Sequence, residues 1–320
     1  MENKAPKPLT PGWYRDFGSY LKEIFGCRVH KISLDAGFSC PNRDGTLSQK
    51  GCIYCNEKGS GTGAWARGIP IAGQIEAARG FLEKRYKAKK FLAYFQSFSN
   101  TYAPVTRLEQ VFEEALAQEK ICGLCIGTRP DCVPDKVLSL LDGLNKKTFL
   151  MMEYGLQSAC DRTLALINRG HDSRAFEETA RKTTALGIRV CAHVILGLPG
   201  ESRQDMQSTA DFLASLGVDA VKIHLLYVIK GSSMEELYKE GGYKPLAMDA
   251  YVDLVCDFLE RLPQKTVIER LTGDPHPQEL AAPSWALGGK ARILDAIRQR
   301  MVERETWQSR LVCANKSNQH

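Results

Sequence analysis

The sequence lacks several features that would place it outside the ordinary globular class. No hydrophobic run approaches the ~20 residues needed to span a bilayer, and the first residues lack the apolar core of a signal peptide. Low-complexity linkers and repeats of solenoid length are also missing. With 320 residues, of which 43% are hydrophobic and 25% charged, the chain can form one large α/β domain or two smaller ones. We therefore expect a cytoplasmic protein with no membrane partner.

A large excess of one charge is missing too. The chain has 43 lysines and arginines against 37 acidic residues, which gives a net charge of +6. This balance permits an RNA partner but does not require one. The densest basic segments are residues 84–90, residues 146–147 and the arginines at positions 292, 298, 300 and 304. Each is interpreted first as a solvated helix surface and only second as a phosphate contact.

Cysteine, in contrast, is abundant, and in a reducing compartment eleven cysteines favour metal sites, catalysis or buried packing over disulfides. Cys40, Cys52 and Cys55 lie in a glycine-rich loop after the first strand-like segment. A structural zinc ion normally has four protein ligands, whereas a four-iron cluster held by three cysteines leaves one iron open for an outside ligand. The cluster is therefore favoured. A Cys₄ zinc site that adds Cys27, in a non-catalytic RNA-binding module, is the alternative.

Apolar segments alternate with helical patterns along the first two thirds of the chain. The predicted strands are residues 30–35, 91–97, 121–128, 148–154, 189–196 and 220–227. The predicted helices are residues 75–85, 107–118, 133–144, runs on either side of Asp172, and 202–216. Strands that are separated by helices are parallel, with each crossover buried under its helix. We expect an α/β fold whose core is a partial (β/α)6 TIM-like barrel.

The pattern changes at both ends of this core. We expect an N-terminal cap over residues 1–29, with a helix at residues 14–25 and no regular structure among the prolines before Gly12. The barrel core is expected over residues 30–230. A C-terminal α/β extension over residues 231–310, with helices near 248–262 and 290–303 around an apolar run at 266–271, should pack on the barrel. Residues 311–320 are expected to form a flexible tail.

In parallel barrels the functional groups gather on loops at the carboxyl ends of the strands. Ser97, Ser99 and Asn100 follow the second strand and suit the amine and carboxylate of an amino acid. Glu153 and Gln157 at the fourth strand could hold sugar hydroxyls, and a carboxylate in so apolar a strand needs a partner.

The fifth and sixth strand ends add further candidates. Ile195 and Gly197 offer an apolar surface and a glycine, against which a flat ring can lie. Lys222 and His224 lie on the sixth strand, where a histidine is more often a hydrogen-bonded core residue than a base. His171 lies in a polar loop, where a role at the start of a helix competes evenly with substrate contact.

The remaining cysteines are expected to serve packing. Cys122 and Cys125 should point to opposite faces of the third strand. A second cluster that combines them with Cys132 is a minor alternative. Cys160 is expected at the start of a helix. Core or incidental positions are expected for Cys122, Cys191, Cys256 and Cys313.

Together the cysteine trio, the polar end of strand two, the Glu/Gln pair and the Ile-x-Gly-Leu-Pro-Gly end of strand five resemble the radical S-adenosylmethionine superfamily. Further motifs resemble its YhcC/YtqA-like branch, which is related to the elongator catalytic subunit. These motifs are residues 35–45, 94–96, 100–104, 127–131, 168–172, 222–226, 270–274 and 283–285. Eleven residues separate Cys40 from Cys52, where three is usual, but a long first gap also marks the elongator-like branch.

This resemblance implies a radical enzyme. Cys40, Cys52 and Cys55 would bind a 4Fe-4S cluster whose fourth iron takes S-adenosylmethionine, and an electron donor such as flavodoxin or ferredoxin would supply the electron that releases a 5′-deoxyadenosyl radical. By the same resemblance, Ser97, Ser99 and Asn100 would contact the methionine end of this cofactor, Glu153 and Gln157 the ribose, and Ile195 and Gly197 the adenine.

The branch also implies a substrate class, namely tRNA. The enzyme would act on the carboxymethylaminomethyl group of a wobble uridine and leave the aminomethyl form. A small metabolite or a protein side chain is the alternative substrate. The candidates for contact with phosphate, base or carboxylate are Arg129, Arg169, His171, Lys222 and His224, and His171, Lys222 and His224 are also candidate catalytic residues.

Overall fold

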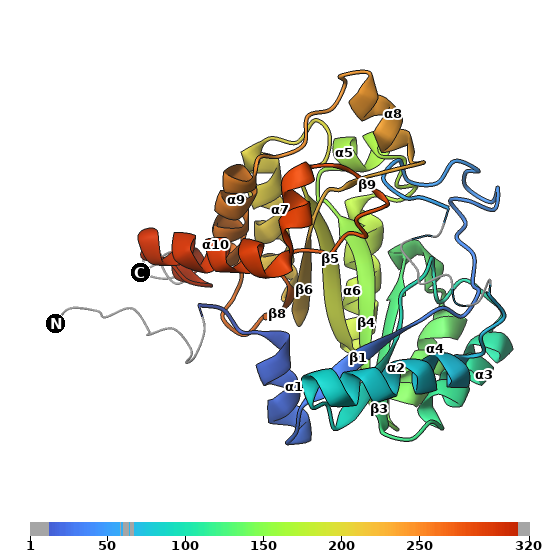
Figure 1. Cartoon of the computed structure of the whole chain (residues 1–320). Coiled ribbons are helices and arrows are strands. Elements are labelled where there is room, and N and C mark those ends of the chain that lie inside the picture. Colours follow the sequence, from blue (N-terminus) through green and yellow to red (C-terminus); the bar gives the residue numbers. More distant parts are fainter. Residues whose placement is uncertain (1–12, 58, 60–63, 65–66, 313–320) are drawn as a thin grey trace.

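The computed structural model describes residues 13–57, 59, 64 and 67–312 (Figure 1). The expectations for residues 1–12 and 313–320, including Cys313, lie outside this part of the chain. Seven strands form one sheet in the order β1-β2-β3-β4-β5-β6-β8, and every neighbouring pair is parallel. The strands are β1 (Val29–Leu34), β2 (Lys90–Phe95), β3 (Ile121–Thr128), β4 (Phe149–Gln157), β5 (Arg189–Leu196), β6 (Ala220–Leu225) and β8 (Val267–Arg270).

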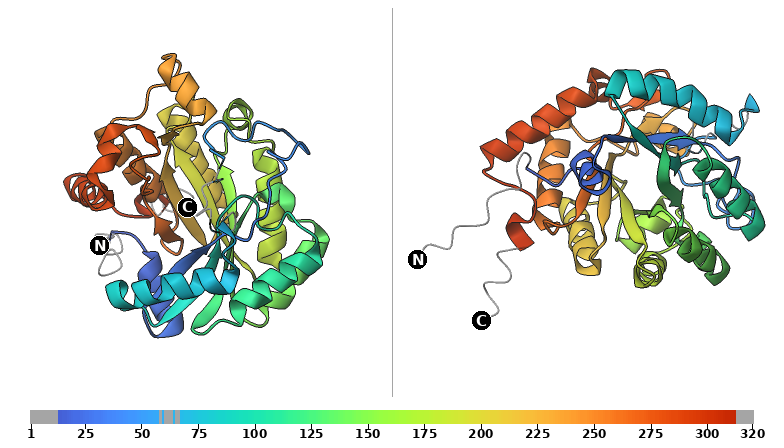
Figure 2. Two further views of the ribbon diagram at one scale, coloured as in Figure 1. Left: turned by 45° about the vertical axis from the view of Figure 1, so that its right-hand side comes forward. Right: turned by 90° about the horizontal axis from the view of Figure 1, so that it is seen from below.

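The sheet curls into a half-barrel with helices on its outer face (Figure 2). The helices between the strands are α2 (Ile71–Tyr86), α3 (Val105–Leu116), α4 (Asp135–Asn145), α5 (Asp161–Leu166), α6 (Ser173–Ala185) and α7 (Arg203–Leu216). The predicted partial barrel is therefore confirmed, with helix and strand ends displaced by a few residues. No helix in the described ranges is long and apolar enough to cross a membrane.

The sheet has one strand more than the sequence predicted. Residues 267–270, placed in the extension, pair with β6 and form the edge strand β8. This strand has only four residues, two of them charged, and α8 (Ser233–Lys239) and α9 (Met248–Arg261) separate it from β6. A short antiparallel pair, β7 (Val228–Ile229) and β9 (Leu280–Ala282), lies above the sheet. The boundary predicted at residue 230 stays a prediction.

Apart from the register shifts, side chains alternate between the two faces along the strands, as the pleat requires. On β4, Met152 and Tyr154 pack under the outer helices, whereas Met151, Glu153 and Gly155 face the interior. The same alternation on the other strands gives the interior three levels. These are an apolar plug at the amino end, a charged layer in the middle and a cavity at the carboxyl end.

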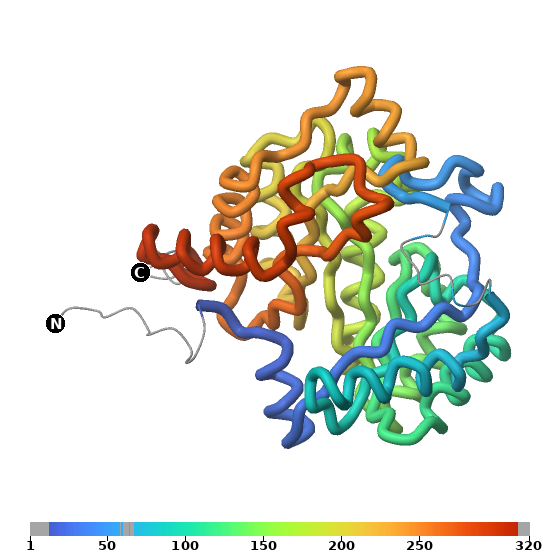
Figure 3. The backbone as a smooth tube through the Cα atoms, in the orientation of Figure 1, coloured from blue at the N-terminus to red at the C-terminus, as the bar shows by residue number. Residues whose placement is uncertain are grey.

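The plug joins the N-terminal helix α1 (Phe17–Phe25) to inward-facing residues of the strands, and the buried Leu21 of this helix packs with Val29 and Met151. The helix begins at Phe17, later than predicted, because the Asp16 side chain caps it by accepting a hydrogen bond from the backbone of Ser19 at 2.9 Å. Asp16 also forms a parallel bridge with Ile268 of β8. The N-terminal segment thus runs beside the last strand (Figure 3).

The third strand contains an irregularity that the sequence did not reveal. The pairing of β2 with β3 shifts register between Phe91 and Ala93, where β3 has one extra residue. Because of this bulge, Cys122 and Cys125 both contact the plug. The prediction that they point to opposite faces is therefore wrong.

Candidate active site

A cavity of about 460 Å³ lies at the carboxyl ends of the strands, where the sequence predicted the functional groups. This volume is within the range of small-molecule sites. Most of the predicted site residues line it together. They are Cys40, Cys52, Cys55, Ser99, Arg129, Glu153, Gln157, Arg169, Ile195, Lys222 and His224.

Four predicted residues are placed elsewhere. Ser97 and Asn100 are buried behind the cavity wall, and the Ser97 hydroxyl and the Asn100 carbonyl oxygen have no hydrogen-bond partner among the described residues. Gly197 packs against Leu246, while its carbonyl accepts a hydrogen bond from Tyr243 at 2.8 Å. His171 lies in its loop with Nδ1 3.0 Å from the carbonyl oxygen of Asp172. Burial and the nearby Arg169 lower the pKa of His171 to about 3.

The cysteine loop is held by a neighbouring loop from residues 168–171. The Asn168 side chain donates to the carbonyl of Gly51 at 2.7 Å, and the Asn42 side chain donates back to the carbonyl of Asn168 at 2.6 Å. Asn42 also lies 3.5 Å from the sulfur of Cys52. These reciprocal bonds fix the approach of Cys52 to the cavity.

Arg169 completes this contact from the other side. Its Nη1 lies 3.6 Å from the Cys52 sulfur, and its Nη2 donates to the carbonyl of Gly155 at 2.5 Å. Burial opposes ionisation of Cys52, but the charge of Arg169 outweighs it, so the pKa of this thiol is lowered. A side chain at Gly155 would clash, because a Cβ there would lie 2.6 Å from Arg169 Nη2.

Arg129 supports the same arrangement. Its guanidinium donates to the carbonyl of Arg169 at 2.7 Å and forms a two-pronged ion pair with Asp131 at 2.8 and 2.9 Å. Both arginines are almost fully buried. Their guanidinium groups therefore brace the cysteine loop, and their predicted contact with substrate stays a prediction.

The Cys₄ zinc alternative is wrong for the described structure. Cys27 precedes β1 and packs with the plug, whereas Cys40 follows β1 at the other end of the barrel. A strand of six residues spans about 20 Å. The proposed second cluster does not form either, because Cys125 is in the plug and Cys132 lies at the carboxyl end, with its backbone carbonyl bonded to Thr101.

Glu153 finds the partners that its burial demands. Its Oε1 accepts from Lys31 Nζ at 2.5 Å, and its Oε2 lies 3.0 Å from Lys222 Nζ and 2.7 Å from His193 Nε2. Lys31 and Lys222 also pair with Glu269. Burial alone would raise the pKa of Glu153, but Lys222 and Lys31 outweigh it and hold that pKa well below its ordinary value.

The sequence analysis identified Glu153 and Lys222 of this charged layer but not the other members. Lys31, Tyr94, His193 and Glu269 were not predicted as its members. The available signal was charge at inward positions of otherwise apolar strands, as in residues 29–34 and 267–270. Glu153, Cys191 and His193 have ligand atoms within 4.8 Å of one another. With both lysines already on Glu153, this group is an ion-pair layer and not a cation site.

The donor set at the cavity mouth fits an iron–sulfur cluster. Three cysteines face one cavity, and among the described residues their sulfurs do not form a group with all atoms within 4.8 Å. A single zinc ion would hold thiolates about 3.8 Å apart, given its bond length of about 2.3 Å. The hydroxyl of Ser99, which lines this cavity, is buried without a hydrogen-bond partner among the described residues and suits a polar cofactor.

Comparison with known proteins agrees with this geometry. Residues 43–213 match the Radical SAM superfamily. The chain belongs to the radical S-adenosylmethionine superfamily. Residues 218–303 match the Radical_SAM C-terminal domain, so β6, β8 and α10 (Lys290–Glu303) lie in a second family segment.

Individual relatives narrow the relationship. The chain is 41% identical to the protein YtqA of Bacillus subtilis (strain 168) over 310 residues, which cover 97% of this chain and 96% of YtqA. It is 32% identical to elongator complex protein 3 of Saccharomyces cerevisiae over 158 residues, or 48% of this chain and 28% of that protein. The structure of the archaeal Methanocaldococcus infernus Elp3 superimposes with a TM-score of 0.68 at 18% identity, covering 88% of this chain and 64% of that chain. The superposition on the archaeal Elp3 structure supports the assignment of the fold.

Proposed function

We propose that this radical S-adenosylmethionine enzyme modifies the wobble uridine of tRNA. The observation that carries the radical chemistry is the cysteine trio at the mouth of a cavity of about 460 Å³. The kinship with elongator complex protein 3 and the net charge of +6 support an RNA substrate. The proposed reaction starts from the carboxymethylaminomethyl group at C5 of the uridine. Loss of a hydrogen atom and one further electron from the methylene carbon between the nitrogen and the carboxylate would give an imine, which water would hydrolyse to the aminomethyl form and glyoxylate, with S-adenosylmethionine as the two-electron oxidant.

In this proposal, one set of residues holds the iron–sulfur cluster and another contacts S-adenosylmethionine. Cys40, Cys52 and Cys55 would hold a 4Fe-4S cluster, and Ser99, Gln157 and the apolar Ile195 would contact S-adenosylmethionine. When bound and reduced by a donor such as flavodoxin or ferredoxin, these cofactors supply a 5′-deoxyadenosyl radical that takes a hydrogen atom from the substrate.

The remaining contribution of the protein is orientation. Asn42 and Arg169 direct N–H groups at the Cys52 sulfur, and such hydrogen bonds favour the thiolate that a metal requires. Ser97 and Asn100 lie behind the cavity with unpaired polar atoms, so their proposed role is support of the methionine-binding wall. Glu153 is saturated by two lysines and His193, and its proposed ribose contact requires a rearrangement of this layer.

The test is anaerobic reconstitution of the purified enzyme with iron and sulfide, followed by an assay for 5′-deoxyadenosine. Transfer RNA from a strain that lacks the enzyme is then added, digested to nucleosides and separated by mass. We expect 5′-deoxyadenosine and a changed uridine. Cys52→Ala should abolish both products and the iron content, while Cys256→Ala, a core cysteine far from the cavity, should retain them.

The two parts of the proposal fail differently. A colourless protein with bound zinc would contradict the cluster. Formation of 5′-deoxyadenosine with an unchanged uridine profile would reject the tRNA substrate and leave the radical chemistry intact.

A further inference from the structure

The second family segment contributes one wall of the cavity, and this wall contains several hydrogen-bond donors, two of them cationic, together with Asp274 and Glu279. The lining residues from this segment include Lys222, His224, Tyr227, Arg270 and His276. Arg270 lies at the end of β8, in register with Lys222 of β6. The bulge beside this pair allows Arg270 to face the cavity although Glu269 faces the interior as well.

The charge of Lys222 is already balanced. Its Nζ lies 3.0 Å from Glu153, 3.1 Å from Glu269 and 2.9 Å from the Tyr94 hydroxyl. Because Lys31 pairs with the same two carboxylates, the layer contains two positive and two negative groups. The layer is therefore neutral, and it offers no carboxylate to a further cation.

Arg270 and His224 do not take part in the ion pairs of this layer. Within the described residues, the Arg270 guanidinium has no hydrogen bond or ion pair, although Asp274 and Glu279 also line the cavity. The Nε2 of His224 is buried and has no partner in the described part of the chain. Burial, His193 and Arg270 hold the pKa of His224 well below its ordinary value, so the ring is neutral. A neutral imidazole can still donate one hydrogen bond.

The pKa of Lys290, at the start of α10, also responds to the charge of Arg270. Partial desolvation and the charge of Arg270 lower its pKa, and only Asp274 acts in the opposite direction among the larger influences. Within the described residues, the wall thus holds the Arg270 guanidinium without a hydrogen-bonded counterion next to the proposed radical site. A partly enclosed arginine without a counterion is costly, and an anion of the right shape removes that cost.

We propose that Arg270 and His224 form a subsite for an anionic group of the substrate, a carboxylate or a phosphate. The planar fork of a guanidinium fits two oxygens of such a group, and His224 supplies a third donor. The subsite rests on the proposed function for its occupant, which would be the carboxylate of the uridine substituent or a phosphate of the RNA. In either case the anion fixes the substrate beside the group that removes its hydrogen atom.

The test compares the reconstituted wild-type enzyme with Arg270→Gln, Arg270→Lys and a matched control. Arg292→Gln is the control, because Arg292 is exposed on α10, outside the cavity lining, and loses the same charge. With tRNA as substrate, Arg270→Gln should raise KM about 10- to 100-fold, the range for a charge-assisted hydrogen bond. The KM of Arg270→Lys should lie between those of the wild type and Arg270→Gln, and the KM of Arg292→Gln should match that of the wild type. Iron content and circular dichroism verify the fold of each variant.

A second measurement does not depend on tRNA. Binding of N-methylglycine and of inorganic phosphate to the wild-type holoenzyme is measured by calorimetry at constant ionic strength, and again with Arg270→Gln. Binding of N-methylglycine that is lost in Arg270→Gln supports a carboxylate subsite, and loss of phosphate binding alone supports a phosphate subsite. If neither anion distinguishes the two proteins, the subsite is rejected. If the anions do distinguish them but no uridine changes, the subsite stands and the tRNA proposal fails.

Discussion

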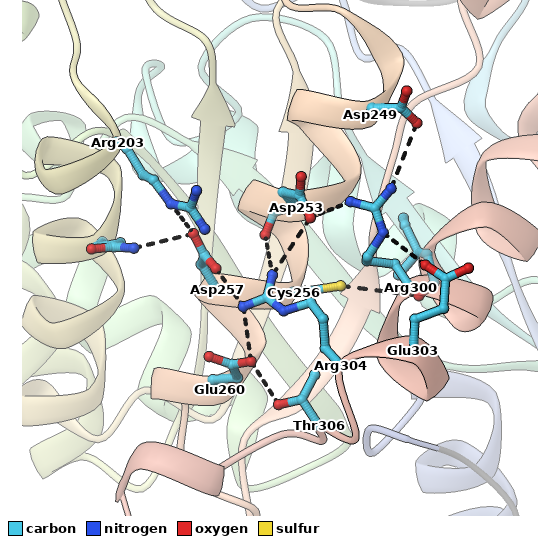
Figure 4. Close-up of polar contacts among 12 residues, drawn as sticks. Arg203, Asp249, Asp253, Cys256, Asp257, Glu260, Arg300, Glu303, Arg304 and Thr306 are labelled. Carbon is cyan, nitrogen blue, oxygen red and sulfur yellow. Dashed lines mark hydrogen bonds and ion pairs between the residues drawn. The ribbon is translucent and has the colours of Figure 1, made fainter.

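Two groups of ion pairs stabilise this molecule in very different surroundings. The inner group is the layer of Lys31, Glu153, Lys222 and Glu269, whose side chains are 0–13% exposed. The outer group joins α7, α9 and α10 outside the barrel (Figure 4).

In the outer group, Asp257 accepts from Arg203 at 2.5 Å and from Arg304 at 2.7 Å, and the Arg203 and Arg304 side chains are 58% and 27% exposed. Arg300 pairs with Asp253 in the same group. Two of the basic residues first considered for phosphate contact, Arg300 and Arg304, are therefore engaged in packing the C-terminal helix.

The difference teaches that the number of ion pairs does not measure their importance. In the outer group the arginines reach water, and Asp257, although only 4% exposed, keeps other donors when one arginine is lost, so each pair contributes little. In the inner group water has little access, and the removal of one charge leaves its partners unpaired in a poorly solvated interior. The inner layer is also the floor of the cavity, so its integrity determines the shape of the active site.

The largest effect is expected from Glu153→Gln, which breaks the inner layer. Lys31 and Lys222 would then share one carboxylate, and the free energy of unfolding should fall by about 3–5 kcal/mol. Urea denaturation in 0.1 M and 1 M salt measures this loss, which should be nearly the same at both concentrations. The double variant Lys31→Met/Glu153→Gln restores the charge balance and should recover part of the loss. A loss below about 1 kcal/mol for the single variant would contradict the contrast between the two groups.

Glu201, a partly buried carboxyl that belongs to neither group of ion pairs, provides a third case for the comparison. Glu201 accepts a hydrogen bond from Ser158 and forms no ion pair with any described residue, and burial raises its pKa to about 7 from the ordinary 4.5. The folded protein therefore keeps this proton up to about pH 7, whereas the unfolded chain releases it above about pH 4.5, so stability falls as the pH rises between these values. Glu201→Gln should remove this decline and raise stability at pH 8, relative to the wild type, by on the order of 2–3 kcal/mol. Unfolding curves from pH 4.5 to 8 provide the measurement, and parallel curves for the two proteins would argue against it.

A smaller effect is expected when the outer group is broken. Arg304→Gln leaves Asp257 with Arg203 and Gln207, so we expect a loss of about 1 kcal/mol in 0.1 M salt. In 1 M salt most of this difference should disappear, because exposed charges are screened within about 3 Å. The same urea experiment measures both values. A loss that is equal at the two salt concentrations would show that the outer group behaves like the inner one.

The smallest effect is expected from a fully solvated pair. Arg174 and Glu178 lie one turn apart on α6, with side chains 81% and 57% exposed. Arg174→Ala should leave the denaturation midpoint within experimental error, because both charges are hydrated with or without each other. A clear shift of the midpoint would indicate that surface pairs contribute more to this fold than the comparison implies.

The sequence predicted those features that arise from local patterns. The alternation of strands and helices gave the half-barrel, and the cysteine loop after the first strand gave the cavity mouth. The strand β8 was missed because four residues with two charges carry no distinct strand pattern. The bulge in β3 was missed because its cause is the pairing with β2, which the local sequence of β3 does not contain.

The candidate site was predictable in its members but less so in their contacts. Arg129 and Arg169 were predicted to meet substrate, which stays a prediction, and the sequence did not reveal that they also brace the cysteine loop through carbonyl and sulfur contacts. Lys31 and Glu269 were not identified because Lys31 meets Glu153 and Glu269 only when the sheet curls. Arg270 became a candidate only once β8 was placed beside β6.

The contact between Lys31 and Glu269 has a consequence for the order of folding. These residues lie on the two outer strands of the sheet and are 238 positions apart in the chain. Among the described residues, β1 and β8 have no backbone pairing with each other, so side chains and the N-terminal segment with α1, which contacts both strands, join the two margins. Contacts of such high sequence separation form late, after the intervening strands have assembled. Amide hydrogen exchange should therefore begin along this seam, well before it reaches β4 and β5 at the centre of the sheet.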